Sequence, residues 1–181
     1  RQRQMCIRDS SHLEKSVNLK HKKRALNVGI KLAKHSWLLF TDVDCRVNKN
    51  WITSIAAHYE NNDYIIGLSE VIPGSSLVSK FQSIDFRMLM LSSFSSTSLG
   101  LPLACSGQNQ SYKKSLFLSV EGFKKIENML QGDDSLFLQI CRKMRKIKTS
   151  FSINPDSFVK SKTHNYWKDF IIQRMRWAGD A

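Results

Sequence analysis

The chain has 181 residues, of which 41% are hydrophobic and 24% charged, which suits one domain with a hydrophobic core and excludes a disordered chain. Lysine and arginine outnumber aspartate and glutamate by 28 to 15, and the net charge of +13 favours polyanionic partners: nucleic acid, anionic lipid or phosphorylated ligands. The sequence has no run of roughly 20 apolar residues that could span a bilayer, and residues 1–10 lack the apolar stretch of a secretory signal.

The four cysteines, Cys6, Cys45, Cys105 and Cys141, are scattered along the chain. They form no Cys-x-x-Cys pair and no cysteine–histidine cluster with the spacing of a zinc site. Isolated thiols in a chain of this size are typical of a reducing compartment, and we therefore expect the protein to face the cytosol.

Hydrophobic periodicity predicts one α/β domain over residues 21–181, whereas residues 1–20 show no pattern and are interpreted as a frayed or partly foreign end. The alternation of helix and strand indicates a doubly wound open sheet. The expected elements are a helix at 21–35, a strand at 37–40, a helix at 50–60, a strand at 64–72, an amphipathic helix within 75–98, a strand within 101–112, a short helix ending near 122, a helix at 132–146, a strand and turn at 150–160, and a helix at 167–177.

Asp42 and Asp44 directly follow the apolar run at 37–40, which is typical of a buried strand in a parallel sheet. Ligands of open α/β sheets bind at the carboxyl ends of the strands. Two carboxylates there can share a hard cation such as Mg²⁺ with the phosphate oxygens of a substrate. Such pairs also arise by chance, so the position after a strand is what favours a metal site.

In the helix within 75–98, Phe81, Ile84, Met88 and Leu91 recur at spacings of three and four residues. This pattern predicts an apolar stripe, for which a position facing the core is the favoured interpretation. The alternative is a helix that lies on a membrane surface.

Asp133 and Asp134 open the helix at 132–146. Acidic residues in a first turn accept hydrogen bonds from exposed N–H groups and suit the helix dipole, which is a purely structural explanation. That explanation suits Asp133 and leaves Asp134 able to accept a proton from a substrate hydroxyl.

The last helix carries Gln173, Arg174, Arg176 and Trp177. Gln173, Arg176 and Trp177 share one face, where arginine can bind phosphate oxygens and tryptophan can offer a flat surface to a sugar. Taken without the other motifs, this segment favours a basic surface helix with a buried tryptophan.

Together these motifs resemble those of the family 2 glycosyltransferases, especially the membrane-bound, cellulose-synthase-like bacterial enzymes, over about residues 20–181. Any single motif is weak evidence, but five motifs in the order and rough spacing of the family are strong evidence. The five are K-x-x-A-L-N at 22–27, D-x-D at 42–44, G-x-N-x-x-Y at 107–112, G-D-D at 132–134 and Q-R-x-R-W at 173–177.

The resemblance implies a GT-A-like fold, that of nucleotide-diphospho-sugar transferases: an open mixed sheet flanked by helices, with the N-terminal βαβ unit that holds the nucleotide base lying outside this chain. It implies an inverting transfer of a sugar from a nucleotide-diphosphate donor to a saccharide or lipid-linked acceptor, assisted by Mg²⁺ or Mn²⁺. It also implies a membrane anchor beyond the last motif and a place at the cytoplasmic face of a membrane, where anionic lipid would attract the basic domain. No nucleic acid is expected as a partner.

On this resemblance, Asp134 is the general base that deprotonates the acceptor and Asp133 is its neighbouring acid. Gly107 and Asn109 line the acceptor site. Lys22 and Lys23 stand where the family often has Gly-Lys, and they receive no role.

The resemblance places the remaining motif residues at the donor. Asp44, together with Asp42, would hold the metal, and Asp42 would lie near the ribose or the diphosphate. Trp177 would also contact the acceptor. The residues near the diphosphate are Asp42, Asp44, Gln173, Arg174, Arg176 and Trp177.

Three other classes of protein stay open. A basic nucleic-acid-binding domain explains the charge, but the sequence carries no helix-turn-helix, zinc or RNA-recognition signature, and both acidic pairs are left unexplained. A catalytically inactive scaffold with a glycosyltransferase fold has the same motifs without turnover. A metal-dependent nucleotidyltransferase has similar acidic pairs, but it leaves the segment at 173–177 as a coincidence.

Overall fold

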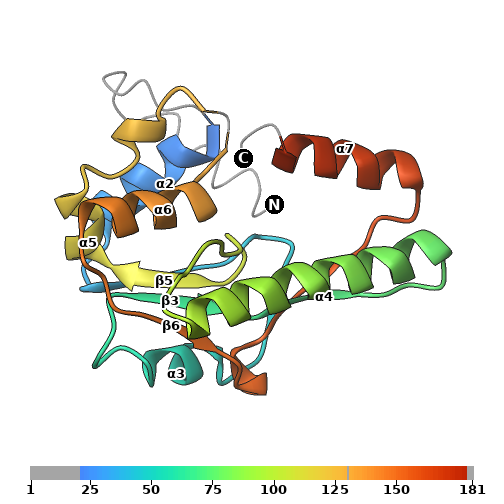
Figure 1. Ribbon diagram of the computed structural model, residues 1–181, viewed down its shortest axis with the longest axis horizontal. Helices are drawn as coiled ribbons and strands as arrows, with labels where there is room; N and C mark the ends of the chain where they lie inside the picture. The colour runs from blue at the N-terminus through green and yellow to red at the C-terminus, as the bar shows by residue number, and fades with distance from the viewer. Residues whose placement is uncertain (1–20, 130, 179–181) are drawn as a thin grey trace.

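The computed structural model describes residues 21–129 and 131–178, so Cys6 and the predictions for residues 1–20 lie outside the described part. Its strands form two sheets (Figure 1). The larger sheet has the order β1 (Trp37–Phe40), β5 (Gln110–Lys113), β3 (Tyr64–Gly67) and β6 (Thr149–Ser152), and the smaller sheet has the order β2 (Arg46–Val47), β7 (Val159–Lys162) and β4 (Ser69–Ile72).

Both sheets are mixed. In the larger sheet, β5 runs antiparallel to both β1 and β3, and β3 runs parallel to β6. In the smaller sheet, β7 is antiparallel to β2 and parallel to β4. The predicted fold class, an open mixed sheet flanked by helices, is confirmed. The expectation of a parallel strand at 37–40 is wrong, because β1 pairs antiparallel with β5.

The single strand expected at 64–72 is two strands, which lie in different sheets. The chain leaves β3 at Gly67, where an added Cβ atom would lie 2.3 Å from the side chain of Asn109. Only glycine allows so close an approach. From Leu68 the chain crosses to β4, so this short segment connects the two sheets.

Two hydrophobic cores lie on opposite faces of the larger sheet. Side chains alternate along β3, so Tyr64 and Ile66 belong to one core and Ile65 to the other. The first core packs under α2 (His21–Leu32), α5 (Lys114–Ser119) and α6 (Ser135–Met144), and the second under α3 (Trp51–Ala56) (Figure 1).

A pair of helices, α4 (Leu77–Ser98) and α7 (Trp167–Ala178), extends from this body (Figure 1). The two helices are in contact with each other, and α4 also contacts β4 and β6. No helix in the described ranges is both long enough and apolar enough to cross a bilayer.

The apolar stripe of α4 faces outward. Its four predicted core residues are all exposed: Phe81 by 49%, Ile84 by 64%, Met88 by 59% and Leu91 by 48%. The favoured core-facing interpretation is therefore wrong. The buried residues of α4 are a mixture of apolar side chains with hydroxyl and amide side chains: Val78, Ser79, Gln82, Ser83, Phe86, Met90, Ser93 and Thr97.

Candidate active site

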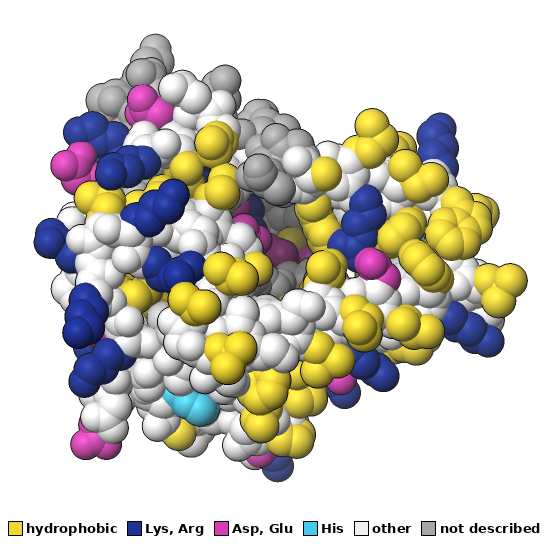
Figure 2. Space-filling model, in the orientation of Figure 1, with side chains coloured by type: hydrophobic (Ala, Val, Ile, Leu, Met, Phe, Trp, Pro, Cys, Tyr) yellow, Lys and Arg dark blue, Asp and Glu magenta, His cyan; other side chains and the backbone are white. Residues whose placement is uncertain are grey.

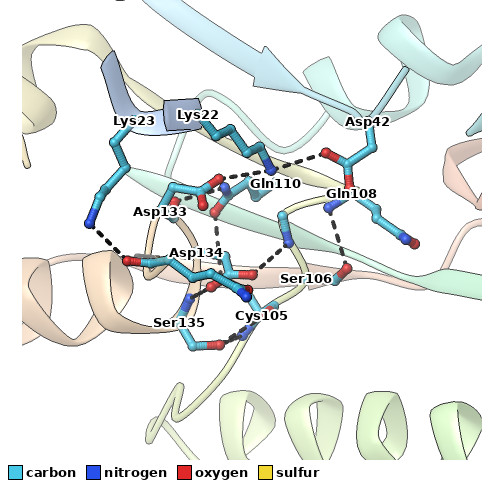
Figure 3. A network of polar contacts seen from close by, with 12 residues as sticks. Lys22, Lys23, Asp42, Cys105, Ser106, Gln108, Gln110, Asp133, Asp134 and Ser135 are labelled. Carbon is cyan, nitrogen blue, oxygen red and sulfur yellow. Dashed lines mark hydrogen bonds and ion pairs between the residues drawn. The ribbon is translucent and has the colours of Figure 1, made fainter. Parts of the chain in front are cut away.

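Lys22 joins the two acidic motifs. Its Nζ atom on α2 lies 3.0 Å from Oδ1 of Asp42, which follows β1, and 2.9 Å from Oδ2 of Asp133, which precedes α6 (Figure 3). Burial lowers the pKa of Lys22, but the charges of Asp133 and Asp42 outweigh it, and the net pKa is raised above its ordinary value. The ammonium therefore stays protonated and offsets the negative charge of both motifs.

Asp134 lies beside this ion pair as the N-cap of α6. Its Oδ1 atom accepts a hydrogen bond from the backbone N–H of Ser135 at 2.6 Å, and its Oδ2 atom accepts one from Gly107 at 3.3 Å. The capping role predicted for Asp133 thus belongs to Asp134, because the carboxylate of Asp133 turns to Lys22. Burial, followed by the negative charge of Asp133, raises the pKa of Asp134 above its ordinary value.

Gly107 borders the acidic centre, which we define as Lys22, Asp42, Asp133 and Asp134. A Cβ atom on Gly107 would lie 3.3 Å from Oδ2 of Asp134 and 3.5 Å from Nζ of Lys22. The absence of a side chain therefore leaves room next to the carboxylate of Asp134. The predicted acceptor segment and the predicted base do meet at this point.

Asn109, the second predicted acceptor residue, is completely buried. Its Nδ2 atom donates to the carbonyls of Leu68 and Ser157, both at 2.8 Å, and its Oδ1 atom accepts from Nε1 of Trp51 at 3.1 Å. The side chain thus connects the crossover between the sheets to α3. Its amide is enclosed and bonded on both atoms, and a place for Asn109 in the wall of the acceptor site stays a prediction.

Asp42, Asp44 and Cys45 offer ligand atoms within 4.8 Å of one another. Burial, followed by the charges of Asp42 and Asp44, raises the pKa of Cys45 to about 11. A soft thiol is a poor ligand for a hard ion such as Mg²⁺ whatever its protonation. The two carboxylates have the oxygen chemistry that Mg²⁺ and Mn²⁺ accept, and phosphate oxygens can complete such a site. Of the three residues, the two aspartates therefore fit the predicted ion, and Cys45 does not.

The residues of the last motif contact α4. Arg174 forms an ion pair with Asp85, and its guanidinium lies 4.3 Å from the ring centroid of Trp177. The Oε1 atom of Gln173 accepts a hydrogen bond from Gln82 at 3.0 Å. Three of the four predicted donor residues on α7 are thus engaged between the two helices, outside the acidic centre.

The end of α7 nevertheless approaches the loop before Asp133. The Nε2 atom of Gln131 lies 3.5 Å from the carbonyl oxygen of Arg176, and Arg176 itself is exposed. Within this motif, Arg176 is the cation with the freedom to reach a ligand near the acidic centre.

Sequence reasoning missed the part played by the two lysines of α2. Lys23 is completely buried, and its Nζ atom donates to the carbonyls of Ile126, Met129 and Gln131. It thus holds the loop that leads to Asp133. The burial of Lys23 cannot be recognised from the sequence, because other lysines fill the exposed face of the same helix. Lys22, by contrast, could have been singled out by its place in the K-x-x-A-L-N motif.

No curated protein sequence matches this chain. Among solved structures, mannosyl-3-phosphoglycerate synthase from Rubrobacter xylanophilus matches with a TM-score of 0.38 and 11% sequence identity over 92% of this chain. The chain spans about half of that protein, 54% of its length.

The family model of glycosyl transferase family 21 matches residues 7–179, almost the whole chain. The predicted resemblance to glycosyltransferases is confirmed, whereas membership of family 2 is not confirmed. The chain belongs to glycosyl transferase family 21.

Proposed function

We propose that this chain carries the catalytic centre of an inverting, metal-assisted glycosyltransferase. The donor is a nucleotide-diphosphate sugar, and the acceptor is a saccharide or lipid-linked hydroxyl. The observation that carries the proposal is the ion pair of Lys22 with both Asp42 and Asp133, because it brings the donor-side and acceptor-side acids into one centre.

Asp134 is the general base of this proposal. Its carboxylate accepts the proton of the acceptor hydroxyl as the hydroxyl oxygen attacks the anomeric carbon, and the bond to the nucleoside diphosphate breaks. A single displacement of this kind inverts the anomeric centre. The raised pKa of Asp134 and the open space at Gly107 support the assignment, and Asp133 acts indirectly, through Lys22.

Asp42 and Asp44 are the residues that would hold Mg²⁺ or Mn²⁺. When bound, the ion stabilises the negative charge that develops on the leaving diphosphate. Arg176 and Gln173 are proposed to approach the same diphosphate, and Trp177 to approach the acceptor as well. Arg174, held by Asp85 and stacked on Trp177, serves this motif by fixing the position of that ring.

The outward face of α4 and α7 is proposed to rest on an anionic membrane surface at the cytoplasmic side. Figure 2 shows hydrophobic side chains gathered over these two helices. The apolar residues exposed there include aromatic rings typical of membrane interfaces, and exposed cations flank them. The apolar residues are Leu77, Phe81, Ile84, Met88, Leu91, Trp167, Ile171, Ile172 and Met175, and the cations are Lys80, Arg87 and Lys168.

Calorimetric titration with UDP and with GDP tests the donor site, in the presence of Mn²⁺ and again with a chelator. We expect metal-dependent binding of at least one nucleotide by the wild type and its loss in Asp44→Ala. If a chain with a cooperative thermal transition binds neither nucleotide, the proposed donor site is wrong. Salt-sensitive binding to any DNA duplex without a need for metal would instead favour a nucleic-acid-binding domain.

A further inference from the structure

A pocket of about 350 Å³ lies at the smaller sheet, and Asp44 of the proposed metal site is part of its lining. Four charged residues line it, together with the end of β4 and the segment that precedes α7. Three of them are cations and one is an anion: Arg46, Lys160, Lys162 and Asp44. Asp44 is therefore shared between the pocket and the proposed metal site.

The smaller sheet fixes the cations in place. Arg46 on β2 is paired directly with Lys160 on β7 in the antiparallel register. Lys160 and Lys162 are two residues apart on one strand, so both project from the same face, and both are exposed. Backbone pairing, rather than loop geometry, thus brings three positive charges to one pocket.

The three cations share the pocket with Asp44 but lie outside the ion pairs seen in the described part of the chain. Among the described residues, no ion pair involves Arg46, Lys160 or Lys162, although Glu70 is the register partner of Lys160. By contrast, Lys113 on β5 pairs with Asp63 at 2.7 Å. Like charges held close together repel one another, and a multiply charged anion relieves that repulsion.

The position of the pocket indicates the kind of anion. Arginine and lysine form charge-assisted hydrogen bonds with phosphate oxygens, and an anion here would lie next to Asp44. On the other side, the pocket is bounded by Gly74 and Asn165, which lie just before α4 and α7. The pocket therefore extends from Asp44 of the proposed metal site to the segments that lead into α4 and α7.

We propose that this pocket binds a phosphate group of a ligand that reaches the acidic centre. Its identification as a substrate subsite rests on the proposed function, whereas the binding of phosphate does not. The phosphate has two possible sources, a water-soluble substrate and the headgroup of a lipid. Both present the same oxygens to Arg46, Lys160 and Lys162.

Titration with inorganic phosphate in the presence of a chelator tests the site without the metal. The full chain is compared with a variant carrying Lys160→Gln and Lys162→Gln, and with Lys143→Gln, an exposed lysine of α6 outside the pocket. We expect saturable binding that the double variant weakens by at least about tenfold and that Lys143→Gln leaves unchanged. If the double variant loses its thermal transition, Arg46→Gln, on a different strand, provides the same comparison.

Asp44→Asn separates this proposal from the proposed function. Because Asp44 is the one carboxylate lining the pocket, its neutralisation should strengthen phosphate binding severalfold in chelator, while it abolishes nucleotide binding in Mn²⁺. Absence of metal-dependent nucleotide binding would overturn the proposed function and leave the phosphate site intact. The phosphate site is overturned if the wild type shows no saturable binding, or if Lys143→Gln weakens binding as much as the double variant.

Two further ligands identify the source of the phosphate. Displacement of inorganic phosphate by glycerol phosphate, with no displacement by vesicles, supports a water-soluble substrate. Displacement by vesicles that contain phosphatidic acid, but not by vesicles of phosphatidylcholine alone, supports a lipid headgroup. If neither ligand displaces it, the pocket binds an isolated ion only, and the assignment as a substrate subsite fails.

Discussion

The Nζ atom of Lys22 lies 2.9 Å from Oδ2 of Asp133, an ion pair that ties α2 to the loop opening α6. Asp133 is buried, and Asp134 follows it directly. Without the ammonium, the carboxylates of Asp42, Asp133 and Asp134 would face one another with no opposite charge between them. Lys22 thus allows the two acidic motifs to share one site.

Replacement of Lys22 by methionine should lower the free energy of unfolding by about 1–2 kcal/mol at pH 7. Loss of one partner of a buried pair costs more than this, but the side chain of Lys22 is 47% exposed and solvent offsets part of the loss. Urea denaturation measures the change. The control Lys113→Met removes the ion pair with Asp63, which lies outside the acidic centre. Metal-dependent nucleotide binding should be kept in Lys113→Met and lost in Lys22→Met.

Replacement of Asp134 by asparagine should lower the rate of sugar transfer by about 10²- to 10⁴-fold, the usual contribution of a general base. Nucleotide binding should be unchanged, because the donor contacts lie with Asp42 and Asp44. Single-turnover transfer from a radiolabelled donor measures the rate, and calorimetry measures the binding. Equal losses of rate and binding would contradict a role confined to proton transfer.

The same substitution should not destabilise the protein. The pKa of Asp134 is raised on folding, so the folded state holds the proton more tightly than the unfolded state does. Below the pKa that Asp134 has in the unfolded chain, the carboxyl is protonated in both states and its ionisation costs no stability. As the pH rises from that value through the raised pKa of the folded state, the free energy of unfolding falls. Asparagine keeps an N-cap acceptor without the charge, so denaturation at pH 7 should show equal or higher stability for Asp134→Asn, and a smaller fall in stability between pH 4 and 7.

The sequence was sufficient to predict most elements, because hydrophobic periodicity depends on local spacing. It was insufficient where contacts between distant segments determine the end of a strand or the position of a side chain. The strand at 64–72 divides because Gly67 passes within van der Waals contact of Asn109, a contact between segments far apart in the chain. The position of Asp133 depends on Lys22, which contributes from a helix that sequence reasoning treated as a lysine-rich surface.

The prediction that the apolar stripe of α4 faces the core was wrong for a different reason. Periodicity indicates that Phe81, Ile84, Met88 and Leu91 share a face, but it does not indicate which face of the helix packs against the sheets. The packed face of α4 carries Phe86 and Met90 as well as hydroxyl side chains, and these hydroxyls find partners inside the protein. Ser93, for example, donates to the carbonyl of Ala104 at 2.6 Å. An apolar stripe predicts the buried face only when one face of the helix packs on a core and the other faces water.

The two close glycines should respond differently to replacement by alanine. In Gly107→Ala the new methyl group lies 3.3 Å from Oδ2 of Asp134, a tight contact that narrows the space for an acceptor, so transfer should slow while stability changes little. In Gly67→Ala the methyl group would lie 2.3 Å from Asn109, so the crossover must shift and stability should fall by about 1–3 kcal/mol. Thermal denaturation and transfer assays on both variants test this contrast.

Replacement of Ile84 by glutamate should weaken binding to vesicles containing phosphatidylglycerol about tenfold or more. The substitution removes an apolar side chain from the proposed membrane face and adds a charge that anionic lipid repels. Ile52→Glu is the matched control, since Ile52 is 65% exposed on α3, on the opposite side of the larger sheet from α2 and α6. Co-sedimentation with vesicles should separate the two variants, and both should keep the stability of the wild type, because neither side chain is part of a core. Equal retention of both on vesicles would show that charge alone, rather than the apolar face of α4, holds the chain at the lipid.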